Sequence, residues 1–589
     1  MLTSPAFPAE RHPSPETHAA SGHTRTRAGD ALILPSEHLP SGWLPRVLNA
    51  RDLTVLCLFS VLLVSNVPLI AGAGGAAYLY WWFGFLTFLI PSALVCAQLY
   101  RLFPGEGAVY LWANKAFGSF WDTFIGLFCN WFPGALGLAI EAGAVITYVQ
   151  ALNPTWLSLT WQQGVAEIIV LVLAQALCML AHRHLQRILN TVFFAYSGCF
   201  VLLGLAGLIW TLSGHTPQGD LSARGWHISQ GTWPVFATVI VSLLGMAVPL
   251  NMGAEVITQR SGKRYVWWGV AITIVGYMIA TTAILLVLPP KDLANPAFLT
   301  EVFQLAFGST LGTFLGLVMN LVLIVYFVCA TAAFNVMFSR LLVVAGVDRR
   351  LPMKVQRLNK KRIPLNATLI QTTLNVVFIV ILFFVVPAFA PATQGLSFVV
   401  FLVTINGASV VWNIAMIGLF LCGILLCTRY RYYLRGQWVV PPVVLYLAAG
   451  LGMGASGIAI FFTFFAGSPV PQVLANGDWD YYVLLVVLGS LALGAAYSFL
   501  VPEAEDLVAI ANTRKAASPR QPSGSVIEPN GTREDSHVPQ HVSLSSIRTA
   551  RPAGSVPPSG NHDLPGELFS GIPRHSSSYR RGNLPGRMG

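Results

Sequence analysis

The chain has 589 residues, of which 54% are apolar or aromatic and only 10% are charged. Soluble domains carry about 25% charged residues, and a water-soluble protein of this length needs that charge to cover its surface. The composition therefore excludes a soluble globular enzyme, and its high apolar content excludes disorder throughout. It indicates a polytopic membrane protein.

The formal net charge is +11, from 35 Lys and Arg residues against 24 Asp and Glu residues. We do not expect nucleic acid as a partner, because the basic residues gather in loops between apolar segments, where they orient a membrane protein. The eight cysteines lie in or beside apolar segments and show no CxxC spacing. We therefore expect them to be buried thiols, with no disulfide, no metal and no cofactor.

The chain divides into three regions. Residues 1–51 and 503–589 are polar and rich in Pro, Ser and Gly, and we expect both to be disordered tails. The core, 52–502, is almost continuously apolar. Because a helix needs about 20 apolar residues to cross the hydrocarbon layer, the core predicts an all-α protein with twelve transmembrane helices. The predicted spans are 53–75, 79–102, 120–149, 161–181, 188–213, 234–259, 265–289, 309–343, 365–388, 397–427, 440–465 and 481–502.

Basic residues in the loops set the predicted orientation. If the N-terminus is cytoplasmic, the inner loops carry Arg101, Lys115, Arg183, Arg187, Arg260, Lys263, Arg264, Arg340, Arg349, Arg350, Lys354, Arg357, Lys360, Lys361, Arg362, Arg429, Arg431 and Arg435. The outer loops carry only Arg224 and Lys291. This asymmetry predicts a multi-pass protein of the plasma (inner) membrane with both termini in the cytoplasm.

Two predicted spans contain helix breakers at membrane depth. The first holds Ser65-Asn66-Val67-Pro68, followed by Leu69, and the sixth holds Leu244-Gly245-Met246-Ala247-Val248-Pro249. These spans open two successive groups of five, and interrupted helices at matching positions of two halves point to a transporter binding site. Helix ends at a break expose N–H groups and carbonyls, which could hold the carboxylate and the ammonium of one substrate. The alternative is that these residues only kink their helices.

Three sequence motifs resemble one superfamily. They are AQLYRLFPGEGAVYLWANKAFG (97–118) after the second span, SRLLVVAGVDRRLP (339–352) with RIPLNA (362–367) after the eighth, and GMAVPLNMGAE (245–255) in the sixth. In this order they resemble the amino acid–polyamine–organocation superfamily. The spacing around Pro68 is most similar to its glutamate:GABA antiporter branch, although the Gly-small-Gly triplet common in helix 1 of relatives is missing.

The resemblance implies a five-plus-five inverted-repeat fold with broken helices 1 and 6. It also implies alternating access, by antiport or proton symport, with an amino acid or amine as the small-molecule substrate. The rival interpretation is a non-transporting membrane sensor on the same fold that signals through its tails. A membrane-embedded enzyme would need a convergent His, Asp, Ser or metal cluster, and the sequence offers none.

Three polar residues of the spans are candidates for ion coupling or gating. Glu141 lies deep in the third span, where it carries a proton, binds the substrate amine, or is a structural carboxylate. Glu255 follows the break of the sixth span and is either a gate salt bridge or an anchor at the membrane surface near Arg260. The resemblance places Thr331 near the ion site of sodium-coupled relatives, but its hydroxyl can equally bond back to its own helix.

Overall fold

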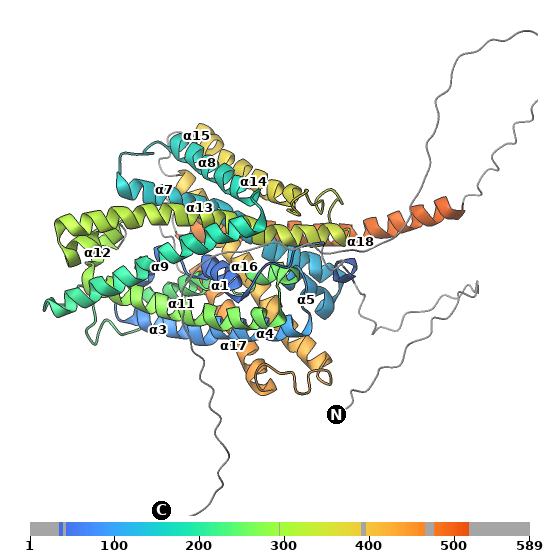
Figure 1. The fold of residues 1–589 in the computed structure, drawn as a ribbon, viewed down its shortest axis with the longest axis horizontal. Helices are drawn as coiled ribbons and strands as arrows, with labels where there is room; N and C mark the ends of the chain where they lie inside the picture. The colour runs from blue at the N-terminus through green and yellow to red at the C-terminus, as the bar shows by residue number, and fades with distance from the viewer. Residues whose placement is uncertain (1–33, 39–42, 294, 390–395, 466–475, 518–589) are drawn as a thin grey trace, which may run out of the picture. The chain divides into compact units, whose positions relative to one another are not determined.

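The helices of the chain run side by side in a bundle (Figure 1). The structure is a computed structural model that describes residues 34–38, 43–293, 295–389, 396–465 and 476–517. Within these ranges every regular element is helical, and the only β-type pairing is one isolated bridge between Leu48 and Val256. Eleven helices are long and apolar enough to cross a membrane.

The α-helices are α1 (Ala50–Val61), α2 (Val67–Ala71), α3 (Ala76–Gly84), α4 (Ile90–Leu102), α5 (Ala108–Phe117), α6 (Ser119–Trp121), α7 (Asn130–Leu152), α8 (Thr160–Cys178), α9 (His182–Leu212), α10 (Pro234–Ser242), α11 (Gln259–Val287), α12 (Phe298–Phe307), α13 (Ser309–Val347), α14 (Leu365–Val380), α15 (Val386–Phe389), α16 (Leu396–Arg429), α17 (Pro442–Phe465) and α18 (Asn476–Ala517). The shorter 3-10 turns are η1 (Pro35–His38), η2 (Val64–Asn66), η5 (Gln230–Thr232), η6 (Val248–Glu255) and η7 (Pro290–Asp292). Wider π-type turns occur at η3 (Phe85–Leu89), η4 (Asp122–Cys129) and η8 (Ile381–Val385).

Eleven of the twelve predicted spans correspond to the eleven long apolar helices, with ends that differ by a few residues. The remaining predicted span, 234–259, is not one helix. It consists of α10, a non-helical turn and η6, which ends at Glu255, and the last predicted residue, Gln259, already begins α11. A continuous twelfth helix is therefore absent from the described residues, because the breakers predicted within this span divide it.

Helix 1 is also interrupted, but earlier than the sequence predicts. The α-helix α1 ends at Val61, and Leu62 and Leu63 leave helical geometry (φ/ψ −122°/80° and −108°/107°). Pro68 instead lies in the first turn of α2. A proline there costs nothing, because the N–H that it lacks would have no partner inside the helix. The break therefore lies at Leu62–Leu63 rather than at the predicted Ser65–Pro68.

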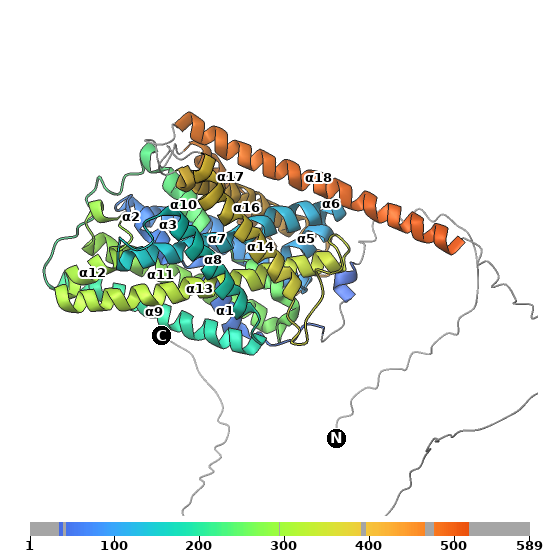
Figure 2. The same cartoon turned by 90° about the horizontal axis from the view of Figure 1, so that it is seen from above.

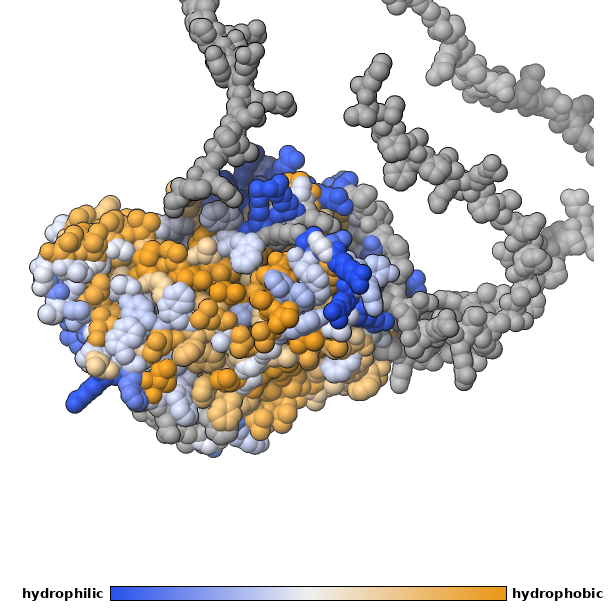
Figure 3. Space-filling view, turned by 90° about the horizontal axis from the view of Figure 1, so that it is seen from below, coloured by the Kyte–Doolittle hydropathy of each residue, from blue (hydrophilic) through white to orange (hydrophobic). Residues whose placement is uncertain are grey.

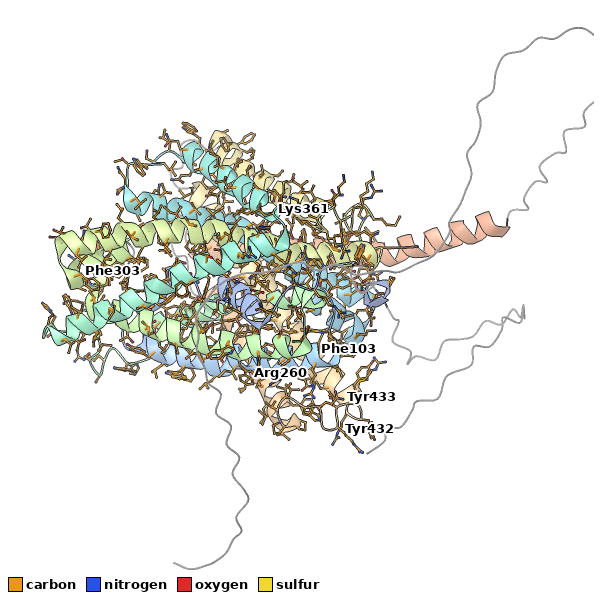
Figure 4. All side chains as sticks on the ribbon, viewed as in Figure 1. Phe103, Arg260, Phe303, Lys361, Tyr432 and Tyr433 are labelled. Carbon is orange, nitrogen blue, oxygen red and sulfur yellow. The ribbon has the colours of Figure 1, made fainter. Side chains whose placement is uncertain are left out.

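The two ends of the bundle differ in polarity. Figure 4 places Phe103, Arg260, Lys361 and the Tyr432–Tyr433 pair towards one end and Phe303 towards the other. Figure 3 shows apolar side chains over much of the visible side and hydrophilic ones gathered towards one end. We call the end that carries Arg260 and Lys361 the basic face.

Parts of both predicted tails belong to the ordered structure. Ahead of α1, the backbone N–H and the hydroxyl of Ser36 each donate a 2.8 Å hydrogen bond to the carboxylate of Asp348, and Glu37 pairs with Lys115 at 2.6 Å. The last helix, α18, continues past the predicted end of its span to Ala517 and runs along one side of the bundle (Figure 2). Tail residues 1–33 and 518–589 lie outside the described residues.

A network of amide side chains joins four helices inside the bundle. The Asn335 amide of α13 donates to Gln175 of α8 (3.1 Å) and Thr372 of α14 (2.9 Å). The Gln371 amide donates to the Asn335 side-chain oxygen (2.7 Å), and the Trp131 ring N–H of α7 donates to Gln371 (2.7 Å). In a low-dielectric interior such bonds hold helices together, and we call this group the amide network.

Candidate functional site

Tyrosine hydroxyls satisfy the backbone groups freed by the break in helix 1. The Leu63 N–H donates to the Tyr277 hydroxyl of α11 (3.1 Å), and the Val64 N–H donates to the Tyr196 hydroxyl of α9 (3.0 Å). The Leu62 carbonyl accepts from Tyr196 (2.8 Å). These hydroxyls are needed because unpaired backbone groups are costly in a membrane interior. The break is thus a polar site, and α9 and α11 supply the hydroxyls around it.

Tyr277 connects the two interrupted helices. Besides accepting from Leu63, the Tyr277 hydroxyl donates to the Ser242 carbonyl at the end of α10 (3.3 Å). The Asn66 amide, in the second half of helix 1, donates to the Ser242 hydroxyl (3.0 Å). The two breaks therefore lie side by side, because Asn66 of helix 1 and Ser242 of α10 are bonded to each other through their side chains.

The turn after α10 depends on glycine. Gly245 has a φ of +121°, which other residues rarely adopt, and a side chain there would come within 2.9 Å of the Ser60 carbonyl. The Ser60 hydroxyl also lies 3.3 Å from the Gly245 carbonyl, and the Tyr265 hydroxyl donates to the Met246 carbonyl (3.1 Å). The turn therefore packs directly against α1, with the Gly245 carbonyl towards α1 and the Met246 carbonyl bonded to α11.

The predicted residues of the sixth span lie at its break, and those of the first span follow the Leu62–Leu63 break within a few residues, with Leu69 as a clear exception. Ser65 and Asn66 are half-buried, whereas 64% of Leu69 is exposed, so Leu69 is not part of the enclosed site. The other predicted residues are buried: Val67, Pro68, Leu244, Gly245, Met246, Ala247, Val248 and Pro249. Sequence reasoning missed Tyr196 and Tyr277, whose hydroxyls bond to the break in helix 1. Tyr326, which the sequence offers either as a residue that lines the pathway or as ordinary packing, bonds to the Leu62 carbonyl (3.4 Å).

Aromatic rings pack around the break in helix 1. Tyr326 of α13 stacks on Tyr196 (ring centroids 3.7 Å apart) and on Phe59 of α1 (4.8 Å). Trp81 of α3 stacks on Tyr277 (4.0 Å). These rings exclude water from the break, so its hydrogen bonds act in a low-dielectric environment.

Glu141 of α7 is a buried acid that forms no ion pair with any residue that the structure describes. Only 3% of the residue is exposed, and one carboxylate oxygen has no hydrogen-bond partner among the described residues. The carboxyl group lies within electrostatic range of Tyr148 and Tyr326. Tyr326 also bonds to the Leu62 carbonyl (3.4 Å), so this tyrosine connects the surroundings of Glu141 with the helix 1 break.

The Thr331 hydroxyl bonds back to its own helix, which is one of the two alternatives that the sequence allows. It is buried on α13, and its hydroxyl donates to the Phe327 carbonyl one turn earlier (2.9 Å). A threonine that bonds back to its own helix has its donor occupied. The structure thus gives Thr331 a hydrogen bond within its own helix, and within the described ranges no other side chain is hydrogen-bonded to its hydroxyl.

Glu255 lies in a buried ion-pair cluster towards the basic face. Its carboxylate is 2.6 Å from the Arg340 guanidinium of α13 and 3.1 Å from the His182 ring of α9. Glu106, in the loop before α5, lies 3.5 Å from Arg340 and accepts a 3.0 Å hydrogen bond from the Ala254 N–H. Glu255 is therefore not an anchor near Arg260, because its partners are Arg340 and His182. We call Glu106, His182, Glu255 and Arg340 the ion-pair cluster.

The ion-pair cluster is short of positive charge, with two carboxylates on one guanidinium. Burial and the neighbouring Glu255 raise the pKa of Glu106 well above its ordinary value, and Arg340 opposes the rise. Glu255 is the closer carboxylate to Arg340 (2.6 Å, against 3.5 Å for Glu106). The cluster thereby joins four segments that lie far apart in the sequence.

Two further acids, Asp122 and Glu167, are buried within the bundle. Asp122 is fully buried and accepts from the Asn114 amide (2.7 Å), with Arg350 at 3.4 Å. Glu167 of α8 is 4% exposed and has an oxygen without a hydrogen-bond partner among the described residues. Neither acid is therefore solvated at a membrane surface.

Comparison with known proteins agrees with this arrangement. The family model described as "Amino acid permease" matches residues 52–491, so the chain belongs to the amino acid permease family within the amino acid–polyamine–organocation superfamily, and is a transporter rather than an enzyme. An uncharacterized transporter of Legionella pneumophila is 24% identical over 358 residues, which cover 57% of this chain and 74% of the relative.

Two other similar proteins have names that refer to amines. A probable agmatine/putrescine antiporter of Lactococcus lactis is 22% identical over 283 residues, 45% of this chain and 57% of the relative. A probable polyamine transporter of Arabidopsis thaliana is 37% identical over 75 residues, 12% of this chain and 15% of the relative.

Proposed function

We propose that the chain is a secondary active transporter that carries an amino acid or a related amine across the plasma membrane by alternating access. In this proposal its core is a five-plus-five inverted repeat, and the basic face, with both termini, is cytoplasmic. The observation that carries the proposal is the contact between two interrupted helices through Tyr277, Asn66 and Ser242. The family match supports transport over the sensor interpretation.

In this proposal, the substrate binds where backbone groups at the breaks bond to side-chain hydroxyls that the substrate can replace. The N–H groups of Leu63 and Val64 bond to neutral hydroxyls, and a substrate carboxylate would make shorter, charge-assisted bonds to the same groups. Carbonyls of Ser242 and Gly245 could accept from a substrate ammonium. Binding would therefore displace tyrosine hydroxyls and change how helices 1 and 6 are held.

We propose that transport is coupled either to the exchange of a second substrate molecule or to the movement of a proton. Glu141, a buried acid that forms no ion pair with any residue that the structure describes, is the group that would bind the substrate amine or carry a proton. The amine antiporter among the relatives supports exchange of one cationic or zwitterionic substrate for another. Thr331 is a weaker candidate for coupling, because its hydroxyl already bonds to Phe327.

Purified protein in liposomes tests the proposal. Vesicles loaded with one amino acid or amine are challenged with a panel of labelled amino acids and their decarboxylated amines, with and without a pH gradient. We expect loaded vesicles to take up at least one member faster than empty ones. A folded protein that moves no member of the panel contradicts the proposal. Equal affinity for an amino acid and its decarboxylated amine would exclude the carboxylate contact at Leu63 and Val64.

A further inference from the structure

Two adjoining cavities open beside the inner half of helix 1. The larger, of about 630 Å³, lies between α1, α9 and α11, and the smaller, of about 270 Å³, lies where α1 and α9 begin. Both are lined by Arg51 and Asn190, so they form one continuous depression. We call it the α1–α9–α11 groove. None of the residues at the substrate site proposed above lines it.

The lining of the groove changes from charged to apolar with depth. Since α1, α9 and α11 all begin at the basic face, residue number increases with depth along each of them. Charged and polar residues line the mouth: Arg51, Asp52, Arg183, Gln186, Arg187, Asn190 and Arg264. One to two turns deeper the wall is mainly apolar: Val55, Leu58, Phe193, Phe194, Trp268 and Ile272. From Arg264 to Ile272 the groove reaches about 12 Å inwards along α11.

The apolar wall faces outwards from the bundle. Phe194 is 83% exposed and Trp268 is 61% exposed. In a chain whose family spans membranes, such side chains meet acyl chains rather than water. An elongated apolar molecule parallel to the helices would cover both rings.

The mouth carries excess positive charge. Arg51, Arg183, Arg187 and Arg264 are exposed, and among the described residues none of the four guanidinium groups forms an ion pair. The one carboxylate at the mouth, Asp52, accepts from the Asn190 amide (2.8 Å) and from the backbone N–H that precedes α1 (3.2 Å). The mouth therefore suits an anion.

We propose that the α1–α9–α11 groove binds an anionic phospholipid, with its phosphate among these arginines and one acyl chain along Leu58, Phe194 and Trp268. Basic pockets between transmembrane helices favour such head groups, because each nearby cationic side chain strengthens binding by several-fold. A free phosphate would gain nothing from the apolar wall, and a neutral lipid would gain nothing from the arginines. Bound here, the lipid contacts α1, the half-helix that ends at the Leu62–Leu63 break.

Native mass spectrometry of the purified full-length protein tests the proposal, with dioleoyl phosphatidylglycerol and dioleoyl phosphatidylcholine as probes. We expect phosphatidylglycerol to bind at least tenfold more tightly, and each of Arg51→Gln and Arg187→Gln to weaken it about fivefold. Arg431→Gln, in the loop between α16 and α17, is the matched control and should change nothing. Added salt should weaken phosphatidylglycerol more than phosphatidylcholine.

The apolar half of the groove has its own variant. Ser197 lines the deep part, and Ser197→Trp should fill it and weaken phosphatidylglycerol without removing any charge. Equal affinity for the two lipids, or unchanged phosphatidylglycerol binding in both arginine variants, overturns the proposal. Competition by soluble glycerol phosphate at the same concentration as the lipid would also overturn it, since it would show a site for a free anion. An unchanged unfolding temperature shows that each variant is folded.

Discussion

The side-chain amide of Asn66 lies 3.0 Å from the hydroxyl of Ser242, so the last residue of η2 and the last residue of α10 hold each other. These residues are far apart in the sequence, and each stands next to a point where a membrane helix is interrupted. Because Tyr277 bonds to both interruptions, the strength of this junction can be tested one hydroxyl at a time.

Tyr277→Phe should reduce substrate uptake by at least tenfold while lowering the free energy of unfolding by only about 1–2 kcal/mol. The ring still stacks on Trp81, and only the two hydrogen bonds are lost. Uptake in liposomes and thermal unfolding measure the two effects. Tyr78→Phe is the control, since it removes a hydroxyl bonded to Thr282 of the same helix α11 but away from the breaks. Equal losses of uptake in the two variants would contradict the assignment.

Gly245→Ala should destabilise the protein and abolish uptake. The added methyl group meets the Ser60 carbonyl, and the φ of +121° strains any side chain. Gly450→Ala, at a helical position of α17 with no atom within 4 Å of the added carbon, should leave both properties unchanged. Ser60→Gly should not restore Gly245→Ala, because the backbone strain remains. Thermal unfolding and uptake that match the unsubstituted protein would show that the turn is not required.

Glu141→Gln should remove the dependence of uptake on a pH gradient if this acid carries the proton. The amide keeps the size of the side chain but cannot release a proton at neutral pH. Glu167→Gln is the matched control, because it changes another buried acid with an oxygen that lacks a hydrogen-bond partner among the described residues. Uptake measured with and without a gradient separates the two. A gradient response that survives Glu141→Gln removes this carboxylate from proton coupling.

Glu106→Gln should flatten part of the pH dependence of stability. Because the pKa of Glu106 is raised, the folded protein binds its proton more tightly than the unfolded chain does. That stabilisation is present below the ordinary pKa of a glutamate and is lost as the pH rises through the raised value. As the pH rises above the ordinary pKa of a glutamate, the unfolding temperature of the unsubstituted protein should therefore fall more than that of the variant. Parallel curves would show that Glu106 does not titrate in this range.

Glu255→Gln should cost about 3–5 kcal/mol of stability, since it leaves the Arg340 guanidinium buried without its closest carboxylate. Arg260→Gln, on the exposed start of α11, should cost less than about 0.5 kcal/mol. Chemical unfolding of the two variants under the same conditions measures the difference. Equal stabilities would mean that the ion-pair cluster does not hold its segments together.

Hydropathy was sufficient to locate the long helices, because the requirement for about 20 apolar residues is local in the sequence. The position of the helix 1 break, in contrast, does not depend on the local sequence alone. Pro68 predicts an interruption at its own position, yet α2 accepts it in its first turn. The chain parts at Leu62–Leu63, where hydroxyls from α9 and α11 replace the lost helical bonds. Nothing near residue 62 in the sequence shows that those hydroxyls are there.

The partners of Glu255 illustrate the same limit. The sequence places it near Arg260, five residues away, whereas the fold brings it to Arg340 and His182. His182 and Arg340 lie far from Glu255 in the sequence, and no local pattern links either of them to it. A buried acid after a helix break signals that some cation must face it, but only the packing of α9 and α13 identifies which one.

The amide network has a mechanical consequence. It joins α7, α8, α13 and α14 through buried side chains that cannot exchange these hydrogen bonds for bonds to water. We therefore expect these four helices to move as one rigid unit. The breaks themselves are held instead by single hydroxyls of Tyr196, Tyr277 and Ser242, which can exchange one partner for another at little cost. When the molecule changes shape, we expect α1, α2 and α10 to move, with Leu62–Leu63 and Gly245 as their hinges, while the Glu255–Arg340 pair keeps the end of η6 on α13.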